Sequence, residues 1–230
     1  MPFAHAQATA VNFTNTTGAT SLSAVLTHPP ANGDLVCVAC FYDASQTTVT
    51  SCVDGNSNIY TRSVSSPSSA QNATSGSATL FYWVANSNGS ATVTFQFTSL
   101  PAASNGVVII VDDFSVSGGT AHFDKDAAGS STVAGTTVNT PVFSPTVTGQ
   151  LFYAYVAPQH ICTAINSPWV GTIETNVNTC AEYILSASGS QNPNVTQTSG
   201  VWDSIMAAFT VVSNYTIEEY GQVTTFGRSV

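Results

Sequence analysis

Short apolar runs, separated by turn-forming residues, recur along the whole of this 230-residue chain. In the clearest run, residues 91–97, alanine, valine and two phenylalanines fall on one parity, while threonine and glutamine fall on the other. Residues two apart lie on the same face of a β-strand, so this pattern predicts a strand with one buried face and one wet face. Helical periodicity is almost absent from the chain. The sequence therefore predicts an all-β fold.

Ten segments have the composition of strands, because they are rich in β-branched and aromatic residues. They are residues 21–27, 34–42, 47–53, 78–84, 91–97, 107–116, 133–138, 150–156, 180–186 and 204–212. Turn-forming pairs such as Asp54-Gly55 and Asn88-Gly89 lie between them. We expect a two-sheet antiparallel β-sandwich, jelly-roll-like, with little or no helix.

Two of these segments, residues 80–84 and 107–111, are apolar on both parities. Such strands are typical of a sheet that is covered on both faces, or of a subunit contact. Asp112 and Asp113 follow the second segment directly. An adjacent acidic pair usually marks the solvated end of a strand, and we expect that here.

The chain is acidic and has very few charges, with three Lys and Arg, twelve Asp and Glu, and a formal net charge of −9. Binding to nucleic acid needs clustered basic residues that release counterions from phosphates, so we expect no nucleic-acid partner. An anionic membrane surface is excluded on the same ground. No apolar run has the length of a membrane span, so we expect no membrane insertion. A hydrophobic fraction of 43% is enough to build a sizeable core.

The N-terminus supports two interpretations. Ala4-His5-Ala6 fits the small-residue pattern at which a secretory signal is cleaved. The other interpretation is a native start that continues directly into the first strand. Both remain open on the sequence.

The five cysteines are an odd number, so they cannot all pair within one chain. Cys40 and Cys52 flank one polar stretch, and Cys162 and Cys180 flank another, so either pair could form a disulfide in an oxidising compartment. The favoured alternative is that the cysteines, which include Cys37, are buried thiols that pack as small apolar residues. The spacing Cys37-x-x-Cys40 lies inside an apolar strand and lacks a second pair of metal ligands.

A weak internal repeat divides the chain. The order of Pro30, Gly33 and Leu35 before a strand is matched by Pro145, Gly149 and Leu151 before another. We expect one β-sandwich domain over residues 1–212, built from two related halves at about 20–117 and 133–212. Residues 213–230 would form a C-terminal extension, which either donates a strand to a neighbour or folds back on its own sheet.

Four short motifs carry a resemblance to known proteins. They are Gly33-Asp34-Leu35, the stretch Val53-Asp54-Gly55-Asn56-x-Asn58-x-Tyr60-Thr61, Phe81-Tyr82-Trp83, and Ala207-Ala208-Phe209. In these motifs, over roughly residues 20–212, the chain resembles uncharacterised jelly-roll-like β-sandwich domains of secreted bacterial surface proteins and phage particle proteins. The resemblance implies a scaffold with no catalytic role.

Candidate chemistry is sparse. Glycosidase carboxylates at strand spacing and the Gly-x-Ser-x-Gly motif of serine hydrolases do not occur, so we expect that the chain is not an enzyme. Asp124 and Asp126, in an expected loop, could contribute oxygen ligands to calcium. Beyond calcium, no cofactor is expected. Asp54-x-Asn56-x-Asn58 begins like a calcium loop but lacks the glycine and the bidentate glutamate that complete one.

The composition favours a non-enzymatic structural module of an extracellular or virion assembly, such as a decoration or cement protein or a filament subunit. Its partners would be copies of itself or a capsid or filament protein. The C-terminal extension could add a strand to a neighbour's sheet edge. Its candidate assembly residues are Tyr215, Ile217, Tyr220, Val223 and Phe226.

The alternative function is a carbohydrate-binding module of a secreted or tail protein. Trp169 lies in the turn-like stretch Ser167-Pro168-Trp169-Val170-Gly171, which indicates an exposed indole. An exposed indole face can stack on a sugar ring, so Trp169 is the candidate glycan-binding residue. Trp83 and Trp202 have the sequence context of core residues.

Overall fold

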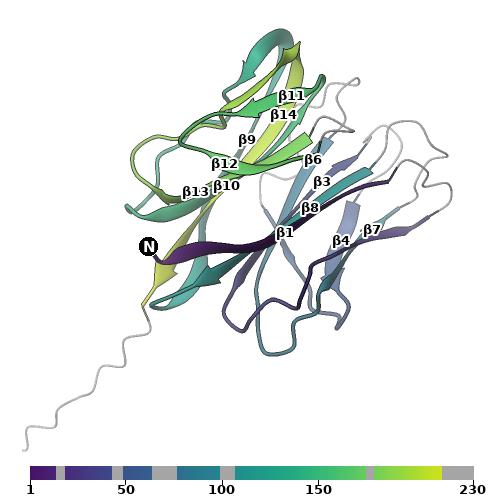
Figure 1. The fold of residues 1–230 in the computed structure, drawn as a ribbon, viewed down its shortest axis with the longest axis vertical. Coiled ribbons are helices and arrows are strands. Elements are labelled where there is room, and N and C mark those ends of the chain that lie inside the picture. The colour runs from purple at the N-terminus through teal and green to yellow at the C-terminus, as the bar shows by residue number, and fades with distance from the viewer. Residues whose placement is uncertain (14–18, 43–48, 64–76, 99–106, 175–178, 214–230) are drawn as a thin grey trace, which may run out of the picture.

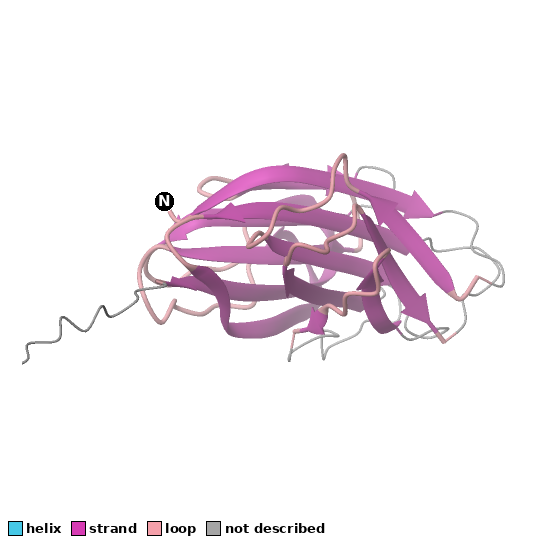
Figure 2. Ribbon diagram, turned by 90° about the horizontal axis from the view of Figure 1, so that it is seen from below, coloured by secondary structure: helices cyan, strands magenta, loops and turns pink. Residues whose placement is uncertain are grey.

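The computed structural model describes residues 1–13, 19–42, 49–63, 77–98, 107–174 and 179–213. Within these ranges the chain forms strands, turns and loops, with no helix (Figure 2). The described residues accordingly contain no helix of the length and apolarity needed to cross a lipid bilayer. The strands pair antiparallel in three sheets that pack face to face. The predicted all-β antiparallel sandwich is confirmed, with three sheets where two were expected.

The central sheet has the strand order β1-β8-β3-β6-β5. Its strands are β1 (Phe3–Phe13), β8 (Val107–Val116), β3 (Leu35–Tyr42), β6 (Ser77–Val84) and β5 (Thr61–Arg62). A three-stranded sheet packs on one face of it, in the order β2 (Ser21–Val25), β7 (Thr92–Phe97) and β4 (Val49–Asp54).

The C-terminal sheet packs on the other face of the central sheet (Figure 1). It has the order β11-β14-β10-β13-β12, and β9 pairs along the other edge of β14. Its strands are β9 (Thr120–Val138), β10 (Gln150–Pro158), β11 (Cys162–Ile165), β12 (Val170–Glu174), β13 (Thr179–Ala187) and β14 (Val195–Val212).

The central sheet is buried on both faces, which explains the strands that are apolar on both parities. All eight residues of β3 are buried. Its odd-numbered residues, beginning with Leu35, pack against Tyr153 and other residues of the C-terminal sheet. Its even-numbered residues, beginning with Val36, pack against Phe95 and other residues of the three-stranded sheet. The prediction that β6 and β8 belong to a sheet covered on both faces is confirmed.

The central and C-terminal sheets share one topology. β8 pairs with β1 and β3, and β3 pairs with β6, which pairs with β5. In the same way β14 pairs with β9 and β10, and β10 pairs with β13, which pairs with β12. The register corresponds as well, since Leu35 lies opposite Phe114 and Leu151 lies opposite Phe209. Gly33 and Gly149, which precede β3 and β10, both have the positive φ that favours glycine (94° and 81°).

The structure differs from the sequence-based expectation at residues 118–135. This stretch was expected to link two halves, yet most of it belongs to β9, which pairs with β14 over nearly its whole length. Its exposed residues include three threonines together with Val133 and Ala134, so the strand has no apolar alternation. Two other strands also differ from the expectation. β1, which begins at Phe3 and includes His5, was not among the ten expected segments, and β14 begins at Val195 instead of at residue 204.

Candidate functional site

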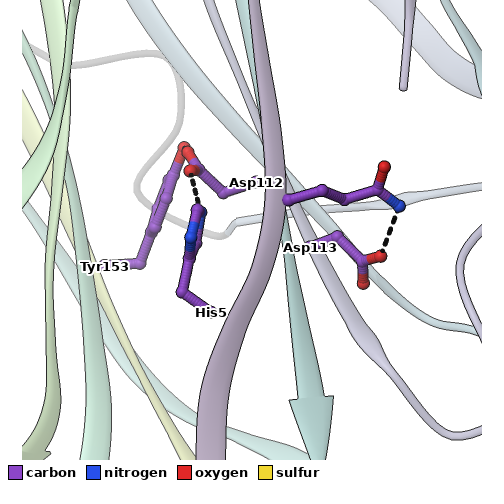
Figure 3. Close-up of polar contacts among 5 residues, drawn as sticks. His5, Asp112, Asp113 and Tyr153 are labelled. Atoms are coloured by element: carbon purple, nitrogen blue, oxygen red, sulfur yellow. Dashed lines mark hydrogen bonds and ion pairs between the residues drawn. The ribbon is translucent and has the colours of Figure 1, made fainter. Parts of the chain in front are cut away.

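Asp112 and Asp113 lie inside β8 and are buried, at 1% and 0% exposure. The expectation of a solvated strand end is therefore wrong, because β8 continues between two packed sheets after its apolar residues end. The two side chains lie on opposite sides of the strand (Figure 3). Asp112 faces the C-terminal sheet, where it meets Tyr153, and Asp113 contacts Gln7 of β1.

The Asp112 carboxylate joins the central sheet to the C-terminal sheet. The Tyr153 hydroxyl of β10 donates a hydrogen bond to its Oδ2 at 2.8 Å. His5 Nε2 of β1 lies 2.9 Å from its Oδ1 (Figure 3). Burial is the main cause that raises the pKa of Tyr153 well above its usual value, and the Asp112 charge raises it further. Tyr153 therefore stays a neutral hydroxyl that can donate to the carboxylate.

His5 is also held by aromatic rings from both sheets. Its imidazole stacks on Tyr183 of β13 at 4.9 Å between centroids, and it meets Phe114 of β8 edge-on at 5.4 Å. The His5 side chain is 26% exposed, whereas Asp112 is almost fully buried. The arrangement can hold an imidazole in a fixed orientation while the carboxylate fastens two sheets together.

The C-terminal sheet has an apolar cluster at the position that corresponds to the His5 cluster of the central sheet. Phe123 of β9 lies opposite Phe209 of β14, as His5 lies opposite Phe114. Phe123 stacks on Tyr82 of β6 at 5.1 Å and meets Phe209 edge-on at 5.9 Å. The histidine is thus replaced by phenylalanine in the related cluster, with the ring geometry kept.

The position that corresponds to Asp112 is apolar too. Asp112 lies opposite Cys37 in β8–β3, and Ala207 lies opposite Tyr153 in the matching β14–β10 register. The polar cluster of His5, Asp112 and Tyr153 is therefore a feature of one half of this fold. The other half shows that the same packing can be made from apolar side chains.

Asp113 and Gln7 fasten the segment that follows β2. The Gln7 amide nitrogen donates to Asp113 Oδ2 at 2.9 Å and to the carbonyl of His28 at 3.0 Å. The Gln7 carbonyl oxygen accepts from the backbone N–H of Thr27 and from its hydroxyl. Burial is the largest influence on the Asp113 carboxyl and raises its pKa, while the Gln7 hydrogen bond opposes that rise.

Two other carboxyls have similar internal roles. Asp54 Oδ1 accepts from the backbone N–H groups of Asn56 and Asn58, and Oδ2 accepts from the Ser90 N–H, so the Asp54-x-Asn56-x-Asn58 motif braces two adjacent turns. Glu182 of β13 is fully buried and accepts from the Asn194 N–H at 2.9 Å. Burial, the largest cause, raises the pKa of Glu182 to about 8.

Asp124 and Asp126 lie in β9, not in a loop, and they contact separate partners. Asp124 accepts from the Thr146 hydroxyl and from Gln150, whereas the Ser63 hydroxyl donates to Asp126. Among the residues described, no group of three or more His, Cys, Asp or Glu side chains is placed to hold a metal ion. The calcium site stays a prediction.

Trp169 is 3% exposed, so the expected exposure of its indole is wrong. On the outer face of the C-terminal sheet, Trp169 packs with Phe152 and Met206. Trp202, at 7% exposure, is a core residue as expected. The five candidate assembly residues, Tyr215, Ile217, Tyr220, Val223 and Phe226, lie outside the described residues.

The cysteines are all buried and free, as the favoured interpretation predicted. Sequence reasoning missed the cluster of His5, Asp112 and Tyr153, whose members are far apart in the chain. The one available signal was the position of Asp112 directly after a run apolar on both parities. When a strand is covered on both faces, polar residues that continue the same strand are buried too, as Asp112 is in β8.

The fold and the buried polar clusters define an antiparallel β-sandwich whose ionisable side chains connect its own sheets and turns. Comparison of the chain with known protein families, curated proteins and solved structures finds no match.

Proposed function

We propose that this chain is a structural module of an extracellular or virion assembly, either a decoration or cement protein or a filament subunit. The observation that carries the proposal is the use of the buried carboxyls. Asp54, Asp112, Asp113 and Glu182 each bond to other segments of the chain. Carboxyls committed to internal contacts stabilise a scaffold, because each connects segments that would otherwise be held by packing alone.

The surface chemistry supports the same proposal. The chain has only three Lys and Arg and a net charge of −9, so its polar surface consists mainly of hydroxyl and amide groups. A net charge far from zero keeps free chains apart in solution. Because the chain has few charged residues, few charges must be desolvated when neighbouring copies pack against one another.

Assembly through the C-terminal extension is the proposed mechanism. An edge strand presents unpaired backbone groups, to which a segment from another chain can add by backbone hydrogen bonds. Within the described residues, β2 ends the three-stranded sheet on one side, and its Val25 is 58% exposed. The partners would be copies of this chain or a capsid or filament protein.

Light scattering of two purified forms tests this function. We expect the full chain to form species larger than one chain, and a chain that ends at Ser213 to be monomeric. A full-length variant with serine at the five candidate assembly positions is the matched control, and it should behave like the shortened chain. A full chain that is monomeric at every concentration, or a shortened chain that assembles equally well, would contradict the proposal.

A further inference from the structure

The side chains of Cys162 and Cys180 meet in one apolar cluster of the C-terminal sheet. Cys162 begins β11 and lies opposite Gln197 of β14, whereas Cys180 lies in β13 opposite Val156 of β10. β10 and β11 pair with successive parts of β14 on the edge opposite β9, and β13 pairs with β10, so β11 follows β10 on the side of β14 where β13 lies. Both cysteines pack in the same buried cluster, with Val138, Val156, Val195 and Trp202.

The two thiols are hydrogen-bonded to each other, and the bond makes them chemically unequal. The hydrogen bond from Cys180 is the largest influence on Cys162 and lowers its pKa. The same bond, followed by burial, raises the pKa of Cys180 well above its usual value. A thiolate is the form that attacks disulfides, and Cys162 is also the more exposed of the two residues, at 4% against 0%, so it is the thiol that a reagent in solution meets first.

The remaining cysteines lack this arrangement. Burial is the largest cause that raises the pKa values of Cys37, Cys40 and Cys52 well above the usual range. Cys40 and Cys52 share a core cluster between the central and three-stranded sheets. They provide an internal comparison, since both pairs are buried and only one has hydrogen-bonded thiols.

We propose that Cys162 and Cys180 form a disulfide by exchange with a small-molecule disulfide. The Cys162 sulfur attacks one sulfur of the reagent, which forms a mixed disulfide and releases the first small thiol. The Cys180 sulfur then attacks the Cys162 sulfur, which closes the protein disulfide and releases the second small thiol. The two protein thiols are oxidised, the reagent is reduced, and the two thiol protons end on the released small thiols.

The disulfide would connect β11 to β13 and close the chain between them into a loop. A covalent loop of this kind restricts the unfolded chain and thereby stabilises the folded one. For a loop of this size in a chain of this length, we expect oxidation to raise Tm by roughly 5–10 °C. The proposal is independent of the proposed function, because it concerns thiol chemistry within one chain.

The test treats the native, full-length chain with 2-hydroxyethyl disulfide, then unfolds it, alkylates the free thiols and maps the peptides by mass spectrometry. We expect a cross-linked peptide that joins Cys162 to Cys180, with Cys40 and Cys52 alkylated. The Tm of the parent chain should rise on oxidation, whereas the Tm of Cys162→Ser and of Cys180→Ser should not.

Three results would overturn the proposal. They are a cross-link between Cys40 and Cys52 in place of the expected one, a reaction that stops at mixed disulfides, and thiols that react only after the chain is unfolded. Because each serine variant is compared with its own untreated form, a general loss of stability from the substitution does not affect the outcome.

Discussion

Asp112→Ala is expected to destabilise the fold by about 1–3 kcal/mol. The substitution removes the acceptor of the buried Tyr153 hydroxyl and the partner of His5 Nε2. A buried polar group without a partner keeps its full desolvation cost, so the loss exceeds that of an ordinary surface substitution. Urea unfolding, followed by tryptophan fluorescence, measures the change.

Two variants distinguish this explanation from a simple loss of packing. Asp112→Asn keeps the shape and one acceptor oxygen, so it should cost less than alanine. The combination of His5→Phe, Asp112→Ala and Tyr153→Phe leaves no unpaired polar group in the cluster. Because Phe123 already stacks on Tyr82 at the related position, we expect this variant to recover most of the lost stability. If the combined variant were less stable than Asp112→Ala alone, the explanation would be wrong.

Glu182→Gln is expected to remove a pH dependence of stability. The pKa of Glu182 is raised from 4.5 to about 8 in the folded chain. Between these values the folded chain keeps the proton and the unfolded chain releases it, so unfolding becomes more favourable as pH rises. The stabilising contribution is complete below about pH 4.5 and decreases up to about pH 8, by an amount on the order of 5 kcal/mol.

The measurement is the free energy of unfolding in urea from pH 4.5 to pH 8.5, for the parent chain and for Glu182→Gln. The variant cannot ionise, so the difference between the two chains should change steadily in favour of the variant as pH rises. Glu174→Gln, on the adjacent strand β12, is the matched control and should keep the slope of the parent. Parallel curves for the parent and Glu182→Gln would contradict the assignment.

The strands with a clear apolar pattern could be predicted from the sequence. Residues 91–97 were expected as a strand, and β7 covers all but the first of them. Residues 107–116 were expected as a strand, and β8 has those bounds. Here the burial of side chains determines both the fold and the pattern, so local reasoning was sufficient.

The strands held mainly by backbone pairing could not be predicted in the same way. β9 is 19 residues long, yet its burial pattern is mostly intermediate or exposed. Its position follows from the hydrogen bonds to β14, which depend little on its side chains. The number of sheets was missed for a related reason, since a pattern apolar on both parities does not say what covers each face.

The candidate site depends on contacts that are distant in sequence. His5 and Asp112 are 107 residues apart, and Tyr153 belongs to another sheet. Trp169 illustrates the opposite error, because its turn-like neighbours indicated exposure while its indole covers the outer face of the C-terminal sheet. In both cases the packing of sheets, which local sequence does not specify, decides the environment of the side chain.

The central claim is that buried carboxyls connect separate segments of a scaffold, and the contact of Asp112 with Tyr153, which joins two sheets, tests it most directly. A double-mutant cycle of Asp112→Ala and Tyr153→Phe measures the coupling between the central and C-terminal sheets. We predict a coupling free energy of about 1–3 kcal/mol, because Tyr153→Phe should cost little once the acceptor is gone. Additive effects of the two substitutions would contradict the claim.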